Sequence, residues 1–398
     1  MNGRRVVVTG IGVVASCGVG SDAFWDGLLA EPPRGERRIT DCDPSPWLGP
    51  KEARRTDRFA QFAVAAAAMA LDDAGPVGAD PDRCGVIIGS GVGGLETLEK
   101  QIVICHTKGA DRVSPFLVPM MMANAGAASV SMRFGWRGPC ETPVTACAAG
   151  THAIANAARL VAGGTIDAAL TGGSEAALTP AGVAGFTNMT ALSSSGLSRP
   201  FDVARDGFVI AEGGAVLVIE ALDAARARGA RIYGEILGSA STADAHHITA
   251  PDPDGGGAVR CMELALADAG MAPGDIRQIN GHGTSTPLND AAEAQALAKV
   301  FGSSGPPVTS TKGVTGHALG AAGALEATAV LLSIDRRLIP PTAGLATLDP
   351  EMSIDTVMDG PRPWEPGPTL SNSFGFGRHN GCLVLAPFEP SDFGAMSR

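Results

Sequence analysis

The chain alternates along most of its length between short runs of β-branched residues and longer alanine-rich runs. The first kind is typical of buried β-strands, and the second of helices that pack on a sheet. Glycine and proline clusters separate these segments. The alternation predicts an α/β fold with a mostly parallel sheet. The predicted strands are residues 5–14, 84–88, 168–171 and 215–220, and the predicted helices are 57–74, 150–162, 258–269 and 291–300.

Two parts of the sequence resemble each other. Residues 3–14 and residues 230–241 both indicate a strand that ends in a glycine-containing turn. Residues 144–147 precede a helix rich in Gly and Ala, and residues 308–311 precede a similar run over 313–329. A strand, a reactive residue and a small-residue helix therefore occur once in each part, which favours a duplicated architecture.

The length of 398 residues is enough for two such units. We expect two similar halves packed into one body, with the nucleophile in 1–229 and the two histidines below in 230–398. Chance similarity is the alternative explanation of the internal resemblance.

Charge and composition exclude some classes of function. The formal net charge is −11, which argues against non-specific nucleic-acid binding. No apolar run is long enough to span a membrane. The eight cysteines include no CxxC pair, which in a chain of this length indicates a reduced, cytoplasmic protein.

The N-terminal segment allows two interpretations. Arg4 and Arg5, a following apolar run and then Cys17 resemble a lipoprotein signal peptide. The apolar run is short, however, and Thr9, Gly10 and Gly12 interrupt it. A buried strand over residues 5–14 is the interpretation that we favour.

The stretch 89–94 follows a predicted strand and matches the GxGxxG pattern of dinucleotide-binding loops. That function also needs an acidic residue about 20 positions later, at the end of a second strand. Asp111 has nearly this spacing but lies in a segment that reads as a loop. Nucleotide binding is therefore a weak alternative.

Cys147 lies just after a β-run and at the start of a helical pattern. A thiol at a helix N-terminus feels the positive end of the helix dipole, which is expected to lower its pKa and supply thiolate. Such a cysteine suits covalent acyl transfer. The alternative is a buried structural cysteine.

Two histidines occupy similar corners between a strand and a helix. His282 stands between two glycines, and His317 follows Gly316. Three corners of this kind can converge on one pocket at the ends of the sheet. Metal binding competes with this interpretation, but there is no HExxH motif and no carboxylate at ligand spacing, so we predict no metal site.

Taken together, these segments closely resemble the β-ketoacyl-acyl-carrier-protein synthases, the condensing enzymes of the type II elongating group. The resemblance runs from about residue 4 to about residue 387. It implies a thiolase-like, five-layer αβαβα fold built from two similar halves and usually dimeric. The motifs that carry it are TACAAG around Cys147, NGHGTSTPLND around His282, TKGVTGHALGAAGALEA around Lys312 and His317, and NSFGFGRHN over residues 372–380.

The resemblance assigns catalytic roles position by position. Cys147 matches the nucleophile that accepts an acyl chain from acyl carrier protein. His282 and His317 match the pair that acts on the malonyl extender, and Lys312 and Glu326 match supporting residues. The implied reaction is a decarboxylative Claisen condensation that extends the chain by two carbons, with no metal or organic cofactor.

The resemblance also assigns binding roles. Thr284 and Thr286 match residues that contact the pantetheine arm. Phe376 matches a gating aromatic residue whose backbone N–H joins that of Cys147 in an oxyanion hole. The positions that match the acyl pocket are Val92, Leu117, Phe186, Phe374 and Phe376. The positions that match a basic dock for the acidic carrier protein are Lys51, Arg54, Arg55 and Arg112; an ordinary solvated face is the alternative for these four.

Some features depart from the family pattern. Arg378 and His379 stand where a Gly-Thr or Gly-His pair is common, the loop 193–198 is short, and Thr190 replaces a frequent basic residue. A polyketide or polyene pathway is therefore as compatible with the sequence as fatty-acid synthesis, and the partner is a second copy or a chain-length-factor-like subunit.

Two other functions stay open at this stage. One is a degradative thiolase acting on coenzyme A esters, with Cys382 as its base. The other is a non-catalytic partner subunit of a ketosynthase dimer, which the intact Cys147, His282 and His317 oppose.

Overall fold

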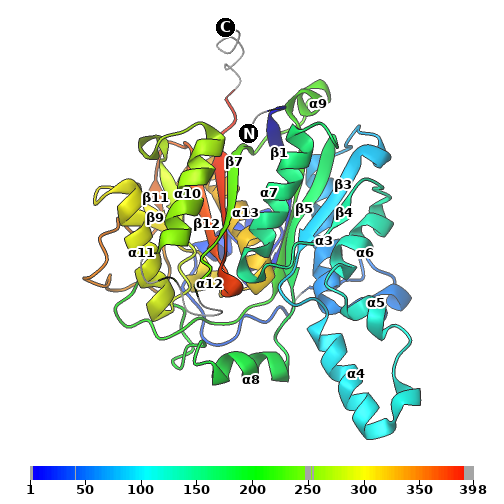
Figure 1. Ribbon diagram of the computed structural model, residues 1–398. Helices are drawn as coiled ribbons and strands as arrows, with labels where there is room; N and C mark the ends of the chain where they lie inside the picture. The colour runs from blue at the N-terminus through cyan, green and yellow to red at the C-terminus, as the bar shows by residue number, and fades with distance from the viewer. Residues whose placement is uncertain (1–2, 41, 247–251, 253–254, 390–398) are drawn as a thin grey trace.

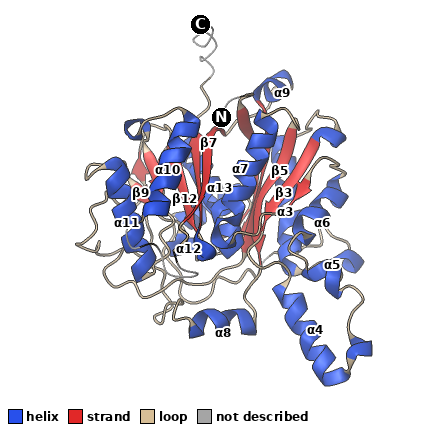
Figure 2. Cartoon of the chain, in the orientation of Figure 1, coloured by secondary structure: helices blue, strands red, loops and turns tan. Residues whose placement is uncertain are grey.

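The computed structural model describes residues 3–40, 42–246, 252 and 255–389. Within these residues, eleven strands form one continuous sheet in the order β4-β3-β5-β6-β1-β7-β13-β12-β8-β9, with β2 paired to β1 (Figure 2). The strands of this sheet are β1 (Val6–Ala15), β2 (Gly18–Val19), β3 (Cys84–Gly89), β4 (Cys140–Glu141), β5 (Ala168–Glu175), β6 (Gly213–Ala221), β7 (Gly234–Ala243), β8 (Gln278–Asn280), β9 (Val308–Thr309), β12 (Thr369–Phe374) and β13 (His379–Ala386). A separate small ladder joins β10 (Leu338–Ile339) to β11 (Arg362–Pro363).

The sheet consists of two halves with the same strand order and the same strand directions. In the first half, β3 is parallel to β4 and β5, and the pairs β5·β6 and β6·β1 are antiparallel. In the second half, β8 is parallel to β9 and β12, and the pairs β12·β13 and β13·β7 are antiparallel. The halves meet where β1 pairs with β7. This repetition confirms that the fold is built from two similar halves.

The expectation of a mostly parallel sheet is wrong. Five of the nine pairings along the order above are antiparallel. The alternation of strand and helix predicts parallel crossovers, but β12 and β13 are joined directly by the short turn 375–378, which reverses the chain. The predicted strand over 5–14 is confirmed, because β1 is buried throughout and lies in the middle of the sheet.

Helices and the two half-sheets form five layers (Figure 1). Helices α7 (Ala149–Ala162) and α13 (Ala322–Arg336) make the central layer, and each contacts strands of both halves. Helices α3 (Arg58–Ala74) and α6 (Ala125–Phe134) cover the outer face of the first half. Helices α10 (Gly256–Ala269) and α11 (Pro287–Phe301) cover that of the second.

The central helices are rich in small residues because they are enclosed on all sides. Every residue of α13 from Ala322 to Ile334 is buried. A Cβ added at Gly150 would lie 2.8 Å from the Ala324 nitrogen, and one at Gly320 would lie 2.2 Å from the Gly91 nitrogen. The starts of α7 and α13 therefore approach each other more closely than larger side chains would allow.

Most of the remaining helices are peripheral, and α4 projects from the body in Figure 1. None of the helices in the described ranges is long and apolar enough to cross a membrane. Of these remaining helices, the short α12 (Lys312–Thr315) is instead buried, and the peripheral ones are α1 (Ser21–Leu28), α2 (Pro50–Ala53), α4 (Leu95–Lys108), α5 (Leu117–Met121), α8 (Pro180–Asn188) and α9 (Leu222–Ala227).

Candidate active site

Cys147 occupies a tight turn between β4 and α7. It lies in the 3-10 segment η3 (Ala146–Ala148), directly before the first residue of α7. Ala146 has a φ of 49°, in the left-handed region that residues with a Cβ rarely adopt. Such backbone strain is characteristic of functional sites, because the surrounding structure must hold it in place. The Cys147 side chain is 4% exposed.

His317 follows the short helix α12, which ends at Thr315 and is capped by Gly316. Its N–H donates to the Val209 carbonyl at 2.7 Å, and its carbonyl accepts from the Ala211 N–H at 3.0 Å. These two bonds hold the backbone of His317 from both sides. As a result, its Nε2 lies 3.0 Å from the Cys147 Sγ.

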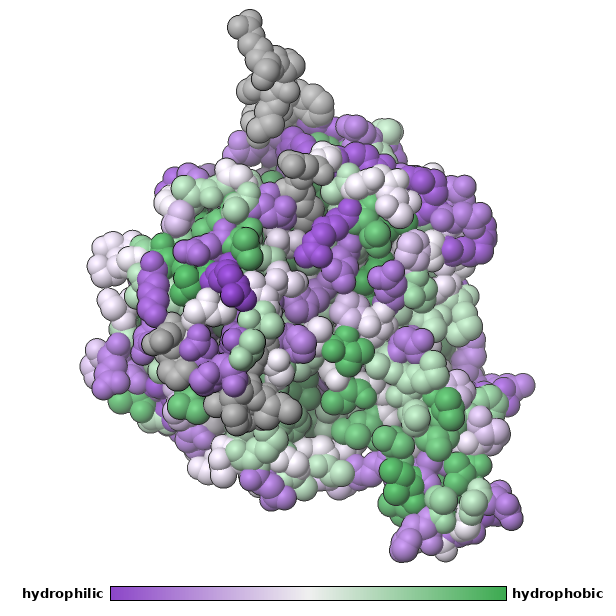
Figure 3. Space-filling model, viewed as in Figure 1, coloured by the Kyte–Doolittle hydropathy of each residue, from purple (hydrophilic) through white to green (hydrophobic). Residues whose placement is uncertain are grey.

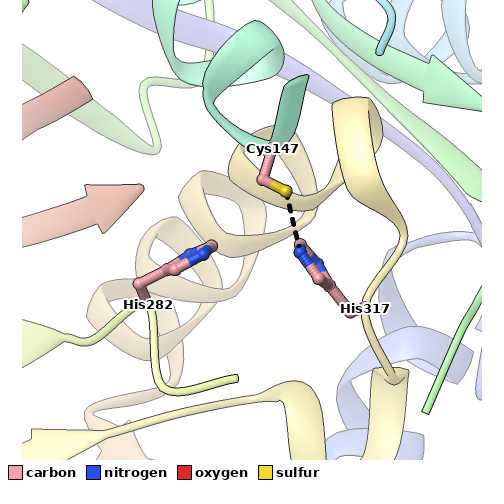
Figure 4. A group of neighbouring side chains, drawn as sticks. All are labelled: Cys147, His282 and His317. Atoms are coloured by element: carbon pink, nitrogen blue, oxygen red, sulfur yellow. Dashed lines mark hydrogen bonds between the residues drawn. The ribbon is translucent and has the colours of Figure 1, made fainter. Parts of the chain in front are cut away.

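The three predicted catalytic side chains meet at one point (Figure 4). The ligand-type atoms of Cys147, His282 and His317 all lie within 4.8 Å of one another. The two imidazole rings are 5.4 Å apart between centroids and nearly perpendicular, at 82°. Three corners of the sheet thus bring Cys147 to a single buried site with two histidines that lie 135 and 170 positions later in the sequence.

Burial dominates the electrostatics of the thiol. Loss of solvent raises the pKa of Cys147 to about 11, although the Phe376 backbone N–H and the charge of Lys312 act in the opposite direction. The lowered pKa expected from the helix dipole is therefore wrong: desolvation outweighs the favourable groups. The thiol needs a base at contact distance, and His317 is there.

His317 is a neutral base in this environment. Burial lowers its pKa well below the usual value of 6.5, and the positive charge of Lys312 lowers it further. The ring also packs edge-on against Phe208, with 5.2 Å between centroids. A neutral imidazole in a dry pocket can both accept a proton and donate a hydrogen bond.

Lys312 and Glu326 form a buried ion pair behind His282. The Lys312 Nζ also donates to the His282 carbonyl at 2.5 Å and lies 3.3 Å from its Nδ1. Because an ammonium group only donates, His282 Nδ1 accepts this bond and the ring proton sits on Nε2. Burial raises the pKa of Glu326 to about 6, against the influence of Lys312 and of Ser373.

Two acidic residues that the sequence analysis did not single out fix the His282 loop. The Glu293 carboxylate accepts the backbone N–H groups of His282 and Gly283, both at 2.7 Å. Asp290 accepts those of Thr284 and Ser285, at 2.9 and 3.1 Å. Both carboxylates belong to α11, and their one sequence signal is their place in the first two turns of a helix that follows the histidine.

A third buried carboxylate explains the GxGxxG stretch. Glu175 accepts the N–H of Gly91 at 2.6 Å, the N–H of Gly320 at 3.1 Å and the Ser90 hydroxyl at 3.0 Å. The glycine loop therefore holds a carboxylate of the protein itself, which removes the basis for nucleotide binding. Burial raises the pKa of Glu175 to about 7.

A cavity of about 360 Å³ leads to the three catalytic side chains. Thr284 and Thr286 lie on its wall, with 2.9 Å between their hydroxyl oxygens, and Thr190 also lines it. Phe374 and Phe376 close another side. The turn that carries Phe376 is closed by the Gly375 N–H, which donates to the His379 carbonyl at 2.8 Å.

Several predicted residues lie outside this cavity. Phe186 is close, since it stacks on Phe376 with 6.4 Å between centroids, but Val92 is 45% exposed and Leu117 is half-buried at the start of α5. The four residues predicted to dock the carrier protein are exposed: Lys51, Arg54 and Arg55 at α2, and Arg112 beyond α4. The short loop 193–198 is fixed by Asp206, which accepts hydrogen bonds from Ser193, Ser194 and Ser195.

Comparison with known proteins adds to this geometry. The model of the β-ketoacyl synthase N-terminal domain matches residues 35–225, and that of the C-terminal domain matches residues 233–346. The chain belongs to the β-ketoacyl synthase family. The prediction of a thiolase-like acyltransferase is thereby confirmed.

Individual relatives agree along nearly the whole length. The chain is 43% identical to the 3-oxoacyl-[acyl-carrier-protein] synthase 2 of Synechocystis, covering 97% of this chain and 99% of the relative. It resembles the ishigamide ketosynthase/chain length factor with a TM-score of 0.92 and 32% identity, over 97% of this chain and 100% of that one. A type II polyketide ketosynthase complex with its acyl-carrier protein matches with a TM-score of 0.88 and 32% identity, over the same shares.

Two alternatives from the sequence, a thiolase-type cysteine base and a metal site, fit the geometry of this β-ketoacyl synthase less well. Cys382, the thiolase-type candidate, is fully buried and donates to the Asn372 side chain at 3.2 Å, away from the cavity. A tetrahedral zinc ion would hold a sulfur and a nitrogen ligand roughly 3.5 Å apart. The 3.0 Å between Cys147 Sγ and His317 Nε2 suits a direct hydrogen bond better than two ligands of one ion.

Proposed function

We propose that this enzyme extends acyl chains by two carbons, through decarboxylative condensation of a malonyl thioester with an acyl group on Cys147. Both substrates are carried on acyl carrier protein. The observation that carries the proposal is the convergence of one thiol and two imidazoles within 4.8 Å in a buried site. The names of the Synechocystis relative and of the carrier-protein complex support it.

In the first half-reaction the Cys147 sulfur attacks the acyl thioester. Its proton passes toward His317 Nε2, the carbon–sulfur bond to the carrier breaks, and the carrier thiol leaves with a proton. The backbone N–H groups of Cys147 and Phe376 stabilise the tetrahedral oxyanion. In the resting enzyme the Phe376 backbone N–H already acts on the thiol, because it opposes the rise in the Cys147 pKa.

In the second half-reaction the malonyl thioester loses CO2 and becomes an enolate. The Nε2–H of His282 and the imidazole of His317 donate to the thioester oxygen, where negative charge develops. Lys312 fixes the proton of His282 on Nε2, and Glu326 holds Lys312. The enolate carbon then attacks the acyl-Cys147 carbonyl, and the Cys147 sulfur leaves.

The cavity wall suits a thioester arm. Thr284 and Thr286 offer hydroxyl groups to the amides of pantetheine, and Phe374 and Phe376 separate this arm from the acyl chain. Lys51, Arg54, Arg55 and Arg112 provide a positive surface for an acidic carrier. Their exposure supports this assignment, and the Arg55 guanidinium additionally lies over the Phe116 ring, 4.4 Å from its centroid.

We further propose a dimer with a second copy or with a chain-length-factor-like subunit. Apolar side chains are exposed near α4, α5 and β4, where Figure 3 shows a hydrophobic surface. Val92 and Leu117 complete the acyl pocket once a partner covers them. The exposed apolar residues of this surface are Val92, Ile102, Val103, Val118, Met122 and Val144.

The remaining parts of the proposal concern cofactor, location and division of the chain. Neither half-reaction requires a metal or organic cofactor. Eight free cysteines favour the reducing cytoplasm. We assign the nucleophile to a half that ends at residue 229 and both histidines to the half that begins at residue 230.

Intact-mass spectrometry tests the proposed function. The protein is incubated with carrier proteins bearing acyl chains of several lengths, and then with malonyl carrier protein. We expect one acyl adduct on Cys147 and a product longer by two carbons. No adduct with any carrier, or an adduct confined to the exposed Cys105 or Cys140, would overturn the assignment. Gel filtration with and without candidate partner chains distinguishes the two dimers.

A further inference from the structure

Arg37 is a buried cation that forms a salt bridge with none of the carboxylates in the described ranges. Its side chain is 2% exposed. Within the part of the chain that the structure describes, its side-chain hydrogen bonds all go to backbone carbonyls. Nε donates to Val314 at 3.0 Å, Nη2 to Gly313 at 3.3 Å, and Nη1 to Gly35. Burial lowers its pKa to about 10.

The two carbonyls on Gly313 and Val314 belong to α12, which carries Lys312 at its start and leads directly to His317. The last carbonyls of a helix lack partners within the helix, and a cation at this end is favourable. The Gly316 N–H satisfies only the Lys312 carbonyl. The guanidinium fork thus supplies bonds for the two carbonyls that lie between two candidate catalytic residues.

The backbone of Arg37 joins the same support. Its N–H donates to Ile210 at 3.0 Å, and its carbonyl accepts from Glu212 at 3.2 Å. The intervening segment 209–211 holds the backbone of His317. A Cβ added at Gly316 would lie 2.6 Å from the Arg37 Cγ, so the arginine stem also packs against the residue before His317. Arg37 therefore contacts the segment before His317 directly through its side chain, and its backbone bonds the strand-like segment that holds His317.

We propose that Arg37 is a positioning residue, which fixes Lys312 and His317 through the carbonyls of Gly313 and Val314. It acts on malonyl decarboxylation more than on acyl loading. Decarboxylation depends on His317, Lys312 and His282 together, whereas loading uses only His317 of these three. Loading takes its oxyanion donors from the nucleophile turn and Phe376, which Arg37 does not contact. This inference rests on the proposed function.

The test compares Arg37→Met, which keeps the apolar stem, with Arg37→Lys, which keeps the charge but not the fork. Arg34→Met, an exposed arginine of the same segment, is the matched control. The rates of acyl loading and of CO2 release from malonyl carrier protein are measured separately, and thermal unfolding is followed for each variant.

Arg37→Met is expected to slow CO2 release by about tenfold or more and loading by less than about threefold. Arg37→Lys is expected to lie between this variant and the wild type, and Arg34→Met to equal the wild type. Equal losses in both rates, or unchanged CO2 release, would overturn the inference. If Arg37→Met does not fold, Arg37→Lys tests the inference instead: CO2 release should fall more than acyl loading, and equal losses would overturn it.

Failure of the wild type itself is distinguishable from failure of this inference. A wild-type protein that neither loads acyl groups nor releases CO2 overturns the proposed function, and the role of Arg37 in it falls too. A wild type that performs both steps, with Arg37→Met indistinguishable from it, overturns only the role of Arg37.

Discussion

The corner after β4 and the corner after β9 occupy equivalent places in the two halves, yet they are built differently. Each ends in a 3-10 turn that begins with a left-handed residue, Ala146 or Leu319, and in the first this turn presents Cys147 at the start of α7. In the second, α12 lies between the strand and α13, and both Lys312 and His317 come from this longer connection. Duplication thus supplied two facing corners, and the longer connection made one of them a proton-handling site and left the other a nucleophile.

The loops after β3 and β8 offer a second comparison. Glu175 fixes the loop after β3, and Glu293 with Asp290 fixes the loop after β8. Each carboxylate is buried and accepts backbone N–H groups. Only the second loop carries a catalytic side chain, His282. The same supporting device therefore serves a structural loop in one half and a reacting loop in the other.

The largest effect is expected from removal of the nucleophile. Cys147→Ala should reduce condensation by at least about 10³-fold, because no covalent acyl intermediate can form. CO2 release from malonyl carrier protein should remain measurable, since the second corner is intact. Chain elongation and CO2 release are assayed on the same preparation. Chain elongation by this variant would show that the assignment of the nucleophile to the corner after β4 is wrong.

His317→Ala should affect the opposite step. Loss of a donor to the developing enolate is expected to lower decarboxylation by about 10²- to 10³-fold. Part of the acyl loading should persist, because the Cys147 and Phe376 N–H groups remain. Stopped reactions analysed by intact mass give the loading rate. A complete loss of acyl loading would mean that His317 is as necessary for acyl transfer to Cys147 as it is for decarboxylation.

Glu293→Gln tests the support of the reacting loop. The amide offers one acceptor, and its NH2 group faces an N–H that needs an acceptor, so kcat should fall by about tenfold. Glu263→Gln, an exposed position on α10, is the control and should leave kcat unchanged. If Glu293→Gln keeps the kcat of the wild type, the Glu293 carboxylate is not needed to support the His282 loop.

The smallest effect is expected from Glu175→Gln. This substitution should change the stability of the folded protein. Burial raises the folded-state pKa of Glu175 from 4.5 to about 7, so the folded wild type binds this proton more tightly than the unfolded chain. The stability that this tighter proton binding gives the folded protein is fully present below pH 4.5 and is lost as the pH rises through 7. The wild type should therefore lose about 3 kcal/mol relative to the variant across this range.

Urea unfolding of both proteins at several pH values between 4.5 and 8 measures this difference, with Glu263→Gln, an exposed position, as the control for a Glu→Gln change. A constant difference between the wild type and Glu175→Gln would show that the carboxylate titrates normally. In that case the loop after β3 would not be fixed by a buried carboxylate as the loop after β8 is.

Local pattern was enough to predict the main elements and the reacting side chains. The strands around 84–88 and 168–171 and the helices over 57–74 and 150–162 coincide with β3, β5, α3 and α7 within a few residues. Cys147, His282 and His317 were recognisable because their glycine-rich corners are local in sequence. Sheet direction was not predictable in this way, since it depends on how distant strands pair.

The supporting groups were beyond local pattern for a physical reason. Glu175, Asp290 and Glu293 look like solvated charges in sequence, and only tertiary burial shows that they accept backbone N–H groups. The pKa of Cys147 likewise depends on desolvation by residues far along the chain. Arg37 is a further case, because its neighbours at 313 and 314 are remote from it in sequence.

The glycines at the starts of the central helices limit how enzymes of this family can be recombined. Because Gly150 meets Ala324 and Gly320 meets Gly91, each half is shaped to the backbone of the other. A chimaera that joins the first half of one synthase to the second half of another should keep its activity only where both parents have glycine at these places. A single methyl group there would separate thiol from imidazole without altering either.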